Sequence, residues 1–138
     1  MKKIFGFLLL SIVVLSIGCG SAKLRGSIPL FNHKWVLSEL NSAPVQISNT
    51  DRDAFLEFTY NDRKVTGYGG CNRISGTFNA AGGAFSFSPL ATTKMSCEDS
   101  KFEDAFLTAL SKVNKYDIDN GELLLKQDKK VLARMIGK

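Results

Sequence analysis

Apolar and polar side chains alternate at every second position in several short stretches between residues 34 and 92, and turn residues separate these stretches. A period of two is typical of antiparallel β-strands that bury one face. In the first strand, Trp35, Leu37 and Glu39 are expected to share one face, with Leu40 at the exit of the strand. The pattern therefore predicts a mainly β fold.

The alternation continues through a second strand, which ends at the turn-forming pair Asn61-Asp62. The residues expected on its buried face are Ala54, Leu56, Phe58 and Tyr60. The next strands are expected at residues 64–70, at residues 74–79 and around Phe85 and Phe87. Gly82-Gly83 precedes the last of these, and its permissive backbone suits a tight hairpin.

The period then changes from two to about 3.6, which predicts one amphipathic helix near residues 98–113. The residues that form its apolar stripe are Phe102, Ala105, Phe106, Ala109, Leu110 and Val113. Ser100 and Glu103 have the spacing of a capping box, and Ser96 is the alternative cap for an earlier helix start.

Strand character returns after the helix, where Tyr116 and Ile118 alternate with polar residues. The hairpin signal Asn120-Gly121 then leads into the apolar run 123–125. In the last strand, residues 131–136, apolar residues stand at both odd and even positions, so the pattern does not show which side chains point inward. About eight strands and one helix predict a small antiparallel β-barrel, closed or nearly so, because closure removes exposed sheet edges.

The chain has 138 residues, fewer than the length at which a hydrophobic core usually divides, so one globular domain is expected. Lys and Arg number 18 and Asp and Glu 13, a formal net charge of +5. Lys2 and Lys3 belong to a segment that we expect to be removed, which leaves 16 − 13 = +3. Such a small and scattered excess argues against a nucleic-acid partner, which needs a basic cluster or stripe.

The N-terminus has the three parts of an export signal. The pair Lys2-Lys3 precedes an apolar run over residues 4–17, and small Gly18 precedes Cys19. This ending resembles a bacterial lipobox, although a serine stands where the lipobox usually has leucine. We therefore expect a signal peptide over residues 1–18 and a lipid on Cys19 that anchors the protein to the membrane.

Residues 19–32 are expected to form a short tether between the anchor and the folded domain. Gly20, directly after the lipidated cysteine, favours the outer membrane by the usual sorting rule of enteric bacteria. An ordinary secreted protein that is cleaved elsewhere, or an uncleaved anchor helix, is the alternative interpretation.

Once Cys19 carries lipid, Cys71 and Cys97 remain as an even pair in a compartment where disulfides persist, so a bond between them is expected. A reactive thiol would need a base, and the one histidine, His33, precedes the first strand. One histidine and two cysteines without Cys-x-x-Cys spacing do not predict a zinc site. No metal or cofactor is expected.

The run from Gly67 to Asn72 is rich in glycine, but no Gly-Lys-Ser/Thr and no helix follow it, so it does not predict a phosphate loop. Between strands, such glycines indicate a bulge, a sharp corner or a close backbone approach.

Four acidic residues at the predicted helix start are explained by the positive end of the helix dipole. They are Glu98, Asp99, Glu103 and Asp104. A calcium site or a catalytic carboxylate pair is the alternative, but the loop spacing of an EF-hand is absent. Most of the phenylalanines are assigned to the core, namely Phe55, Phe58, Phe78, Phe85, Phe87, Phe102 and Phe106.

Three segments together resemble the META domain, also called the HslJ-like family. They are the residues WVLSELN at 35–41, GYGGCNRISGTF at 67–78 and TTKMSC at 92–97. The resemblance covers roughly residues 34–135, with Ser42 at a position where the family often has glycine and Lys94 where arginine is common. It implies a compact antiparallel β-barrel with one helix, often on a lipoprotein, a disulfide between the two motif cysteines and no enzyme activity. The family is loosely linked to heat shock, antibiotic tolerance and motility or secretion.

We therefore expect a non-enzymatic envelope lipoprotein whose META domain, residues 33–138, binds an envelope protein or an apolar ligand, in stress tolerance or in the assembly of another envelope component. The expected site is an aromatic-lined surface or barrel mouth near residues 67–72, where Tyr68 and Arg73 offer polar contacts. Internal packing of Tyr68 and solvation of a turn by Arg73 are the alternative.

Two other function classes stay open. A secreted hydrolase needs a Ser/His/Asp pattern or a Gly-x-Ser-x-Gly elbow, and the sequence contains neither. A purely structural tethered domain needs no site at all.

Overall fold

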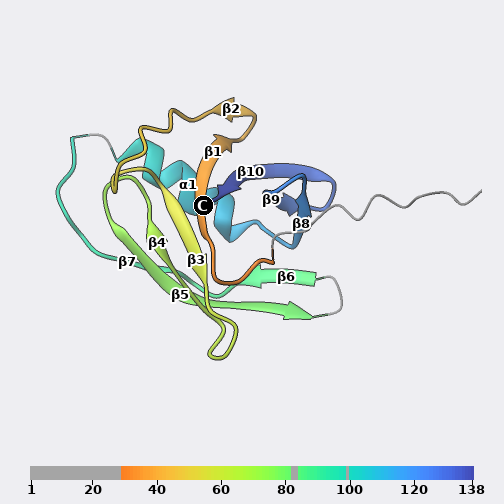
Figure 1. Ribbon diagram of the computed structural model, residues 1–138. Coiled ribbons are helices and arrows are strands. Elements are labelled where there is room, and N and C mark those ends of the chain that lie inside the picture. The colour runs from red at the N-terminus through yellow and green to blue at the C-terminus, as the bar shows by residue number, and fades with distance from the viewer. Residues whose placement is uncertain (1–28, 82–83, 99) are drawn as a thin grey trace, which may run out of the picture.

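The computed structural model describes residues 29–81, 84–98 and 100–138. The predicted signal peptide and Cys19 lie outside these residues, as do Gly82-Gly83 and Asp99. The described part of the chain forms ten strands and one helix (Figure 1). Their bounds are β1 Lys34–Leu40, β2 Ala43–Pro44, β3 Phe55–Phe58, β4 Lys64–Tyr68, β5 Arg73–Ala81, β6 Ala84–Phe87, β7 Ala91–Thr92, α1 Lys101–Ser111, β8 Lys115–Asp119, β9 Glu122–Gln127 and β10 Lys130–Gly137.

Eight of these strands form one antiparallel path in the order β6-β5-β4-β3-β1-β10-β9-β8. The two-residue strands β2 and β7 pair beside it with β1 and β5. The sheet curves until β6 approaches the start of β8, where the Phe85 N–H donates to the Asn114 carbonyl at 3.0 Å. The rings of Phe85 and Tyr116 also lie 5.2 Å apart there. The predicted small, nearly closed antiparallel barrel with one helix is confirmed.

One core joins the inward side chains of the barrel to the buried face of α1. The helix contributes Phe106, Ala109 and Leu110 and packs against β6 and β10 (Figure 1). Aromatic rings fill much of the barrel, with neighbouring centroids 5.0–6.2 Å apart in stacked or edge-on pairs. These rings belong to Phe31, Phe58, Phe78, Phe85, Phe87 and Tyr116. In the described residues, no helix is long and apolar enough to cross a membrane.

Residues before the predicted domain boundary at residue 33 already belong to the packed domain. Leu30 is buried, and its carbonyl accepts the indole N–H of the fully buried Trp35 at 2.8 Å. Phe31 stacks against Phe78. Residues at the end of the predicted tether therefore close one end of the barrel.

A β-bulge in β1 changes which residues face the core. Leu37 pairs with Met135 but Glu39 pairs with Arg134, so Ser38 is the extra residue. The prediction that Glu39 shares the face of Leu37 is therefore wrong. Leu40 enters the core in its place, and Glu39 lies outside, 3.8 Å from the guanidinium of Arg134.

Two aromatic residues assigned to buried positions lie elsewhere. β3 ends at Phe58, so Tyr60 falls in the following turn and is 60% exposed. Phe55 alternates with the buried Leu56 and therefore faces outward, with the ammonium of Lys34 4.1 Å from its ring centroid. The prediction for Tyr60 is wrong because the alternation does not show where the strand ends. The prediction for Phe55 is wrong because it followed residue type, whereas the alternation with Ala54, Leu56 and Phe58 places this ring on the outer face.

The structure assigns the inward face of β10, which the sequence pattern left open. A register shift between Val131 and Ala133 lets Leu132, Ala133 and Met135 all reach the core. Arg134 faces outward and donates to Glu122 at 2.8 Å, and this bond raises the pKa of the guanidinium above its already high usual value.

Candidate functional site

The glycine-rich run forms the corner between β4 and β5, as predicted. The Gly69 N–H donates to the Asn72 carbonyl at 2.8 Å and closes the turn. Gly70 has φ +104°, a conformation that side chains bearing a Cβ rarely adopt. A Cβ on Gly69 would lie 2.6 Å from Oε2 of Glu103, so glycine lets this carboxylate approach the backbone.

The carboxylate of Glu103 reaches from α1 to the corner and is buried there. Its Oε2 accepts the N–H of Cys71 at 3.1 Å and that of Asn72 at 2.6 Å. Its Oε1 accepts the side-chain amide of Asn72 at 2.7 Å. Three donors thus satisfy a buried charge, which anchors the helix to the corner.

The predicted capping box is wrong. Ser100 does occupy the N-cap position of α1, but its side chain makes no capping hydrogen bond. Glu103 lies on the buried stripe of the helix, three residues before Phe106, and turns toward Cys71 and Asn72 instead of back to Ser100. The helix dipole therefore does not explain this acidic residue, although Asp104 remains exposed in the first turn.

Asn72 connects the corner to the segment that follows β7. Its Oδ1 accepts the Met95 N–H at 2.7 Å and the Thr93 hydroxyl at 3.0 Å. The Thr93 hydroxyl oxygen in turn accepts the Arg73 N–H at 3.0 Å. One buried amide therefore orders the start of β5 and the segment 93–95 together.

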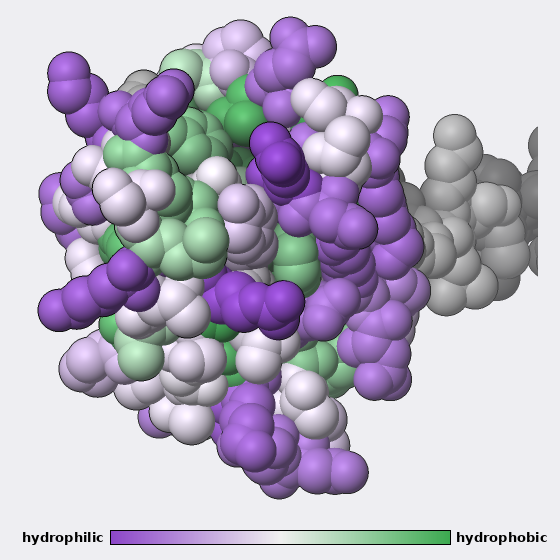
Figure 2. Space-filling view, turned by 90° about the vertical axis from the view of Figure 1, so that its left-hand side faces the viewer, coloured by the Kyte–Doolittle hydropathy of each residue, from purple (hydrophilic) through white to green (hydrophobic). Residues whose placement is uncertain are grey.

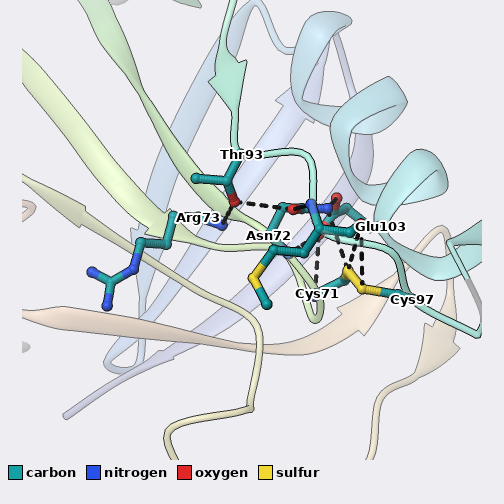
Figure 3. The surroundings of a disulfide bond; sticks show 7 residues. Cys71, Asn72, Arg73, Thr93, Cys97 and Glu103 are labelled. Atoms are coloured by element: carbon teal, nitrogen blue, oxygen red, sulfur yellow. Dashed lines mark hydrogen bonds between the residues drawn. A yellow bond between two sulfur atoms is a disulfide. The ribbon is translucent and has the colours of Figure 1, made fainter.

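The predicted disulfide is present: Cys71 and Cys97 are bonded across 26 residues of sequence. Figure 3 shows it beside Asn72 and Glu103, with the Arg73 side chain pointing away from this group. We call Cys71, Asn72, Thr93, Cys97 and Glu103 the corner cluster. Each of its polar side chains is bonded within the protein, so its evident chemical role is to hold the corner in place.

A concave surface of about 680 Å³ lies between this corner and the loop of residues 41–53. We call it the mouth pocket. Leu40, the loop and Ala54 form one wall, and Gly70 with Phe102 forms the other. In Figure 1 the loop that carries β2 arches over the N-terminal end of α1. Its apolar lining and its size are typical of small-molecule sites, which measure about 300–1,000 Å³.

Tyr68 and Arg73, the predicted binding residues, line a second concavity of about 390 Å³ on the outside of β3–β5. We call it the outer pocket, and Lys34, Asp51 and Phe55 complete it. Tyr68 pairs across strands with Arg73 and with Phe55, so all three face outward. Figure 2, viewed from the side of β4, β5 and β7, shows apolar patches separated by hydrophilic side chains.

The structure thus separates two features that the sequence analysis placed at one site. Gly70 of the glycine-rich run borders the mouth pocket, whereas Gly67, Tyr68 and Arg73 border the outer pocket. The part of the loop 41–53 in the mouth pocket was missed, although this loop supplies most of the lining, because the loop has no periodic pattern. The position of Glu103 on the apolar helical stripe was the one available signal for its buried role.

Asp53 orders the loop side of the mouth pocket. Its Oδ1 accepts the Ser48 N–H at 2.9 Å and its Oδ2 accepts the Thr50 N–H at 3.2 Å. The bond from Ser48 is the main reason that the pKa of this carboxyl is lowered from its ordinary value. Asp53 is therefore ionised at neutral pH, with both oxygens already engaged.

Metal ligation has no support within residues 29–81, 84–98 and 100–138, where no three His, Cys, Asp or Glu side chains are grouped to hold an ion. His33 lies just before β1 and packs its ring 6.0 Å from that of Trp35. The predicted lipidation site, Cys19, lies outside the described residues.

Comparison with known proteins gives a family and a fold. The META domain family model matches residues 28–136. No curated protein matches the chain. An NMR structure of a protein from Burkholderia xenovorans is similar at 23% identity and a TM-score of 0.64, over 79% of this chain and 83% of that one. A second NMR structure is similar at 23% identity and a TM-score of 0.57, over 75% and 88% of the two chains.

Proposed function

The chain belongs to the META domain family, and we propose that it acts as a non-enzymatic binding module of the bacterial cell envelope. The mouth pocket is the observation that carries this proposal. It is the larger of the two concavities at the corner, and apolar side chains such as Leu40, Val45 and Phe102 line it. A concave apolar surface next to a rigid corner suits binding.

The thiols and the buried carboxylate at the corner have structural roles, not catalytic ones. Cys71 and Cys97 are bonded to each other, and both oxygens of Glu103 accept hydrogen bonds from the corner. Catalysis by a nucleophile needs a free side chain with a base beside it. Binding therefore explains this site better than hydrolysis does.

The envelope location rests on the predicted signal peptide and lipid on Cys19, and the disulfide suits an oxidising compartment. The described chain begins beside Phe31, which packs against Tyr60 beyond the end of β3. Ala54, at the mouth pocket, precedes the start of the same strand. The mouth pocket therefore lies near the end of β3 opposite to this N-terminal segment, where a partner in stress tolerance or envelope assembly would reach it.

Site-directed photo-crosslinking in the native membrane tests the binding role. A photoreactive residue replaces Gln46 at the mouth pocket, and the matched control replaces Lys129, which is exposed in the turn between β9 and β10. We expect a discrete protein or small-molecule adduct from position 46 and none from position 129. No adduct at position 46, or the same adducts from both positions, would contradict a binding function of this pocket.

The outer pocket is tested separately, because Tyr68 and Arg73 remain predicted binding residues. If a partner is captured there, Tyr68→Ala and Arg73→Ala should weaken its capture without lowering the melting temperature. A drop in melting temperature with unchanged capture would show that these residues only stabilise the sheet.

Intact mass spectrometry tests the anchor. We expect the mature protein to begin at Cys19 with added acyl mass, and Cys19→Ser to release a folded domain from the membrane. A mature chain that retains Met1, or that starts elsewhere without acyl mass, contradicts the lipoprotein assignment.

A further inference from the structure

Two charged side chains line the mouth pocket, and they differ in whether their charge is already bonded. Both carboxylate oxygens of Asp53 accept backbone N–H groups of its own loop. The guanidinium of Arg52, its neighbour, has no ion pair or hydrogen bond with any residue that the structure describes. The charge left available to a ligand at this pocket is therefore positive.

A second cation lies near the same loop. The ammonium of Lys138 bonds to the side chain of Asn49 and acts on Asp53 through its charge. Asp51, which lines the outer pocket, and Asp53 balance Arg52 and Lys138 in formal charge, so the preference of the mouth pocket for an anion depends on Arg52.

A large part of the remaining lining is suited to hydrocarbon. Leu40, Pro44, Val45 and Ala54 present aliphatic surface, and Phe102 faces them from α1. Gln46, Ser48 and Thr50 add the uncharged polar groups of the lining, on the loop side. An unbranched hydrocarbon chain on the aliphatic part would leave these groups open to water, so no polar group would be buried without a partner.

Building on the proposed binding function, we propose that the mouth pocket binds an aliphatic monocarboxylate, a fatty acid, with its chain on the apolar lining and its carboxylate paired with Arg52. A guanidinium matches a carboxylate with two parallel N–H donors, which favours it over an alcohol or an amine of equal chain length. Arg52 is then the residue that determines specificity for the head group.

The test is calorimetric titration of the expected mature chain, residues 19–138 with Cys19→Ser, so that neither detergent nor an acyl group of its own competes. Decanoate is the probe, and decan-1-ol and decyltrimethylammonium have the same chain with a neutral or cationic head. We expect saturable binding of decanoate, and about tenfold weaker binding of the other two.

Two arginine variants locate the carboxylate. Arg52→Gln should weaken decanoate binding about tenfold and leave decan-1-ol unchanged. Arg73→Gln removes the same charge at the outer pocket, and we expect it to have no effect. Ala43→Trp fills the mouth pocket from an exposed position and should abolish binding of both probes.

Three results would overturn the inference: no saturable decanoate binding, equal affinity for the three probes, or a loss in Arg73→Gln but not in Arg52→Gln. A protein adduct from position 46 together with absent decanoate binding would leave the proposed function standing and refute the fatty acid. If neither the adduct nor decanoate binding is found, the proposed function and the fatty-acid ligand are both refuted.

Discussion

The two walls of the mouth pocket are held in place by different kinds of contact. The corner wall is tied by Glu103, whose bonds to Cys71 and Asn72 span more than 30 residues and are buried. The start of the loop wall is tied to the barrel, because β2 pairs with β1 and the Asn41 N–H donates to the Leu132 carbonyl at 2.8 Å. Its second part, residues 46–53, is ordered largely by Asp53, whose bonds to Ser48 and Thr50 span five and three residues and are exposed. The backbone of the loop also contains three non-glycine residues with positive φ, Asn41, Ser42 and Asn49.

This difference indicates which wall adapts to a ligand. Buried, long-range bonds open only when much of the domain opens, whereas short-range exposed bonds break and re-form locally. The corner is therefore the fixed surface of the pocket, and residues 46–53 of the loop are the part that adjusts. Changes to the corner cluster should lower global stability, and changes to the loop should act locally.

The largest effect is expected from Glu103→Ala. The substitution leaves the N–H groups of Cys71 and Asn72 and the Asn72 amide without acceptors in a buried place, at a cost of about 4 kcal/mol in the free energy of unfolding. Chemical denaturation measures it. Asp104→Ala is the matched control, since this neighbouring carboxylate is exposed and should contribute less than about 1 kcal/mol. Similar losses in both variants would mean that the corner does not depend on the buried carboxylate.

A somewhat smaller loss is expected when the disulfide is removed. In the chain-entropy model, closing a loop of this length stabilises the fold by roughly 3.5 kcal/mol. The double variant Cys71→Ala, Cys97→Ala should unfold at lower denaturant concentration, and a reducing agent should then have no further effect on it. Two alkylatable thiols in folded protein taken from its own envelope would refute the bond itself.

A small gain is expected in the loop from Ser42→Gly. Ser42 has φ 68°, and the strain of a side chain in the left-handed region, about 1 kcal/mol, exceeds the extra unfolded-chain entropy of glycine. The free energy of unfolding should rise by about 0.5 kcal/mol. Ser42→Ala keeps the Cβ and should give no gain, so an equal rise in both variants would assign the effect to the lost hydroxyl.

The smallest effect is expected from the protonation of Asp53. The pKa of Asp53 in the folded protein is lowered, chiefly by the bond from Ser48. Its contribution to the stability of the folded state is therefore fully present at pH values above the pKa of the unfolded state. That contribution is lost as the pH falls through the folded pKa. Amide exchange at Ser48 and Thr50 should therefore accelerate in acid relative to the corner amides, and Asp53→Asn should remove this difference. Parallel behaviour of the two walls would contradict the local character of the loop.

Several features of the fold could be read from local pattern alone. The alternation around Leu56 and Phe58, the turn at Asn120-Gly121 and the stripe from Phe106 to Leu110 each depend on neighbours within a few residues. The Cys71–Cys97 pair followed from cysteine count and compartment. These predictions held because periodicity and turn chemistry are properties of the chain itself.

The wrong predictions for Glu39 and Glu103 have the same cause: each side chain is placed by a partner segment far away in the sequence. Glu39 leaves the core because a bulge at Ser38 shifts β1 against β10, and alternation within one strand does not report its partner. Glu103 has the spacing of a cap, yet it is more favourably bonded to two backbone N–H groups of a corner 31 and 32 residues away. Contacts between segments far apart in the sequence determine where the side chains of both residues lie.

The sequence by itself determined the fold class, the family, the glycine corner and the two cysteines that bond there, because each is encoded by residue type at fixed spacing. Only the tertiary structure decided that the corner faces the loop 41–53 across an apolar pocket, and that Tyr68 and Arg73 lie outside it. The physical reason is that a pocket is a surface between segments, and its shape depends on how far apart the closed barrel holds them.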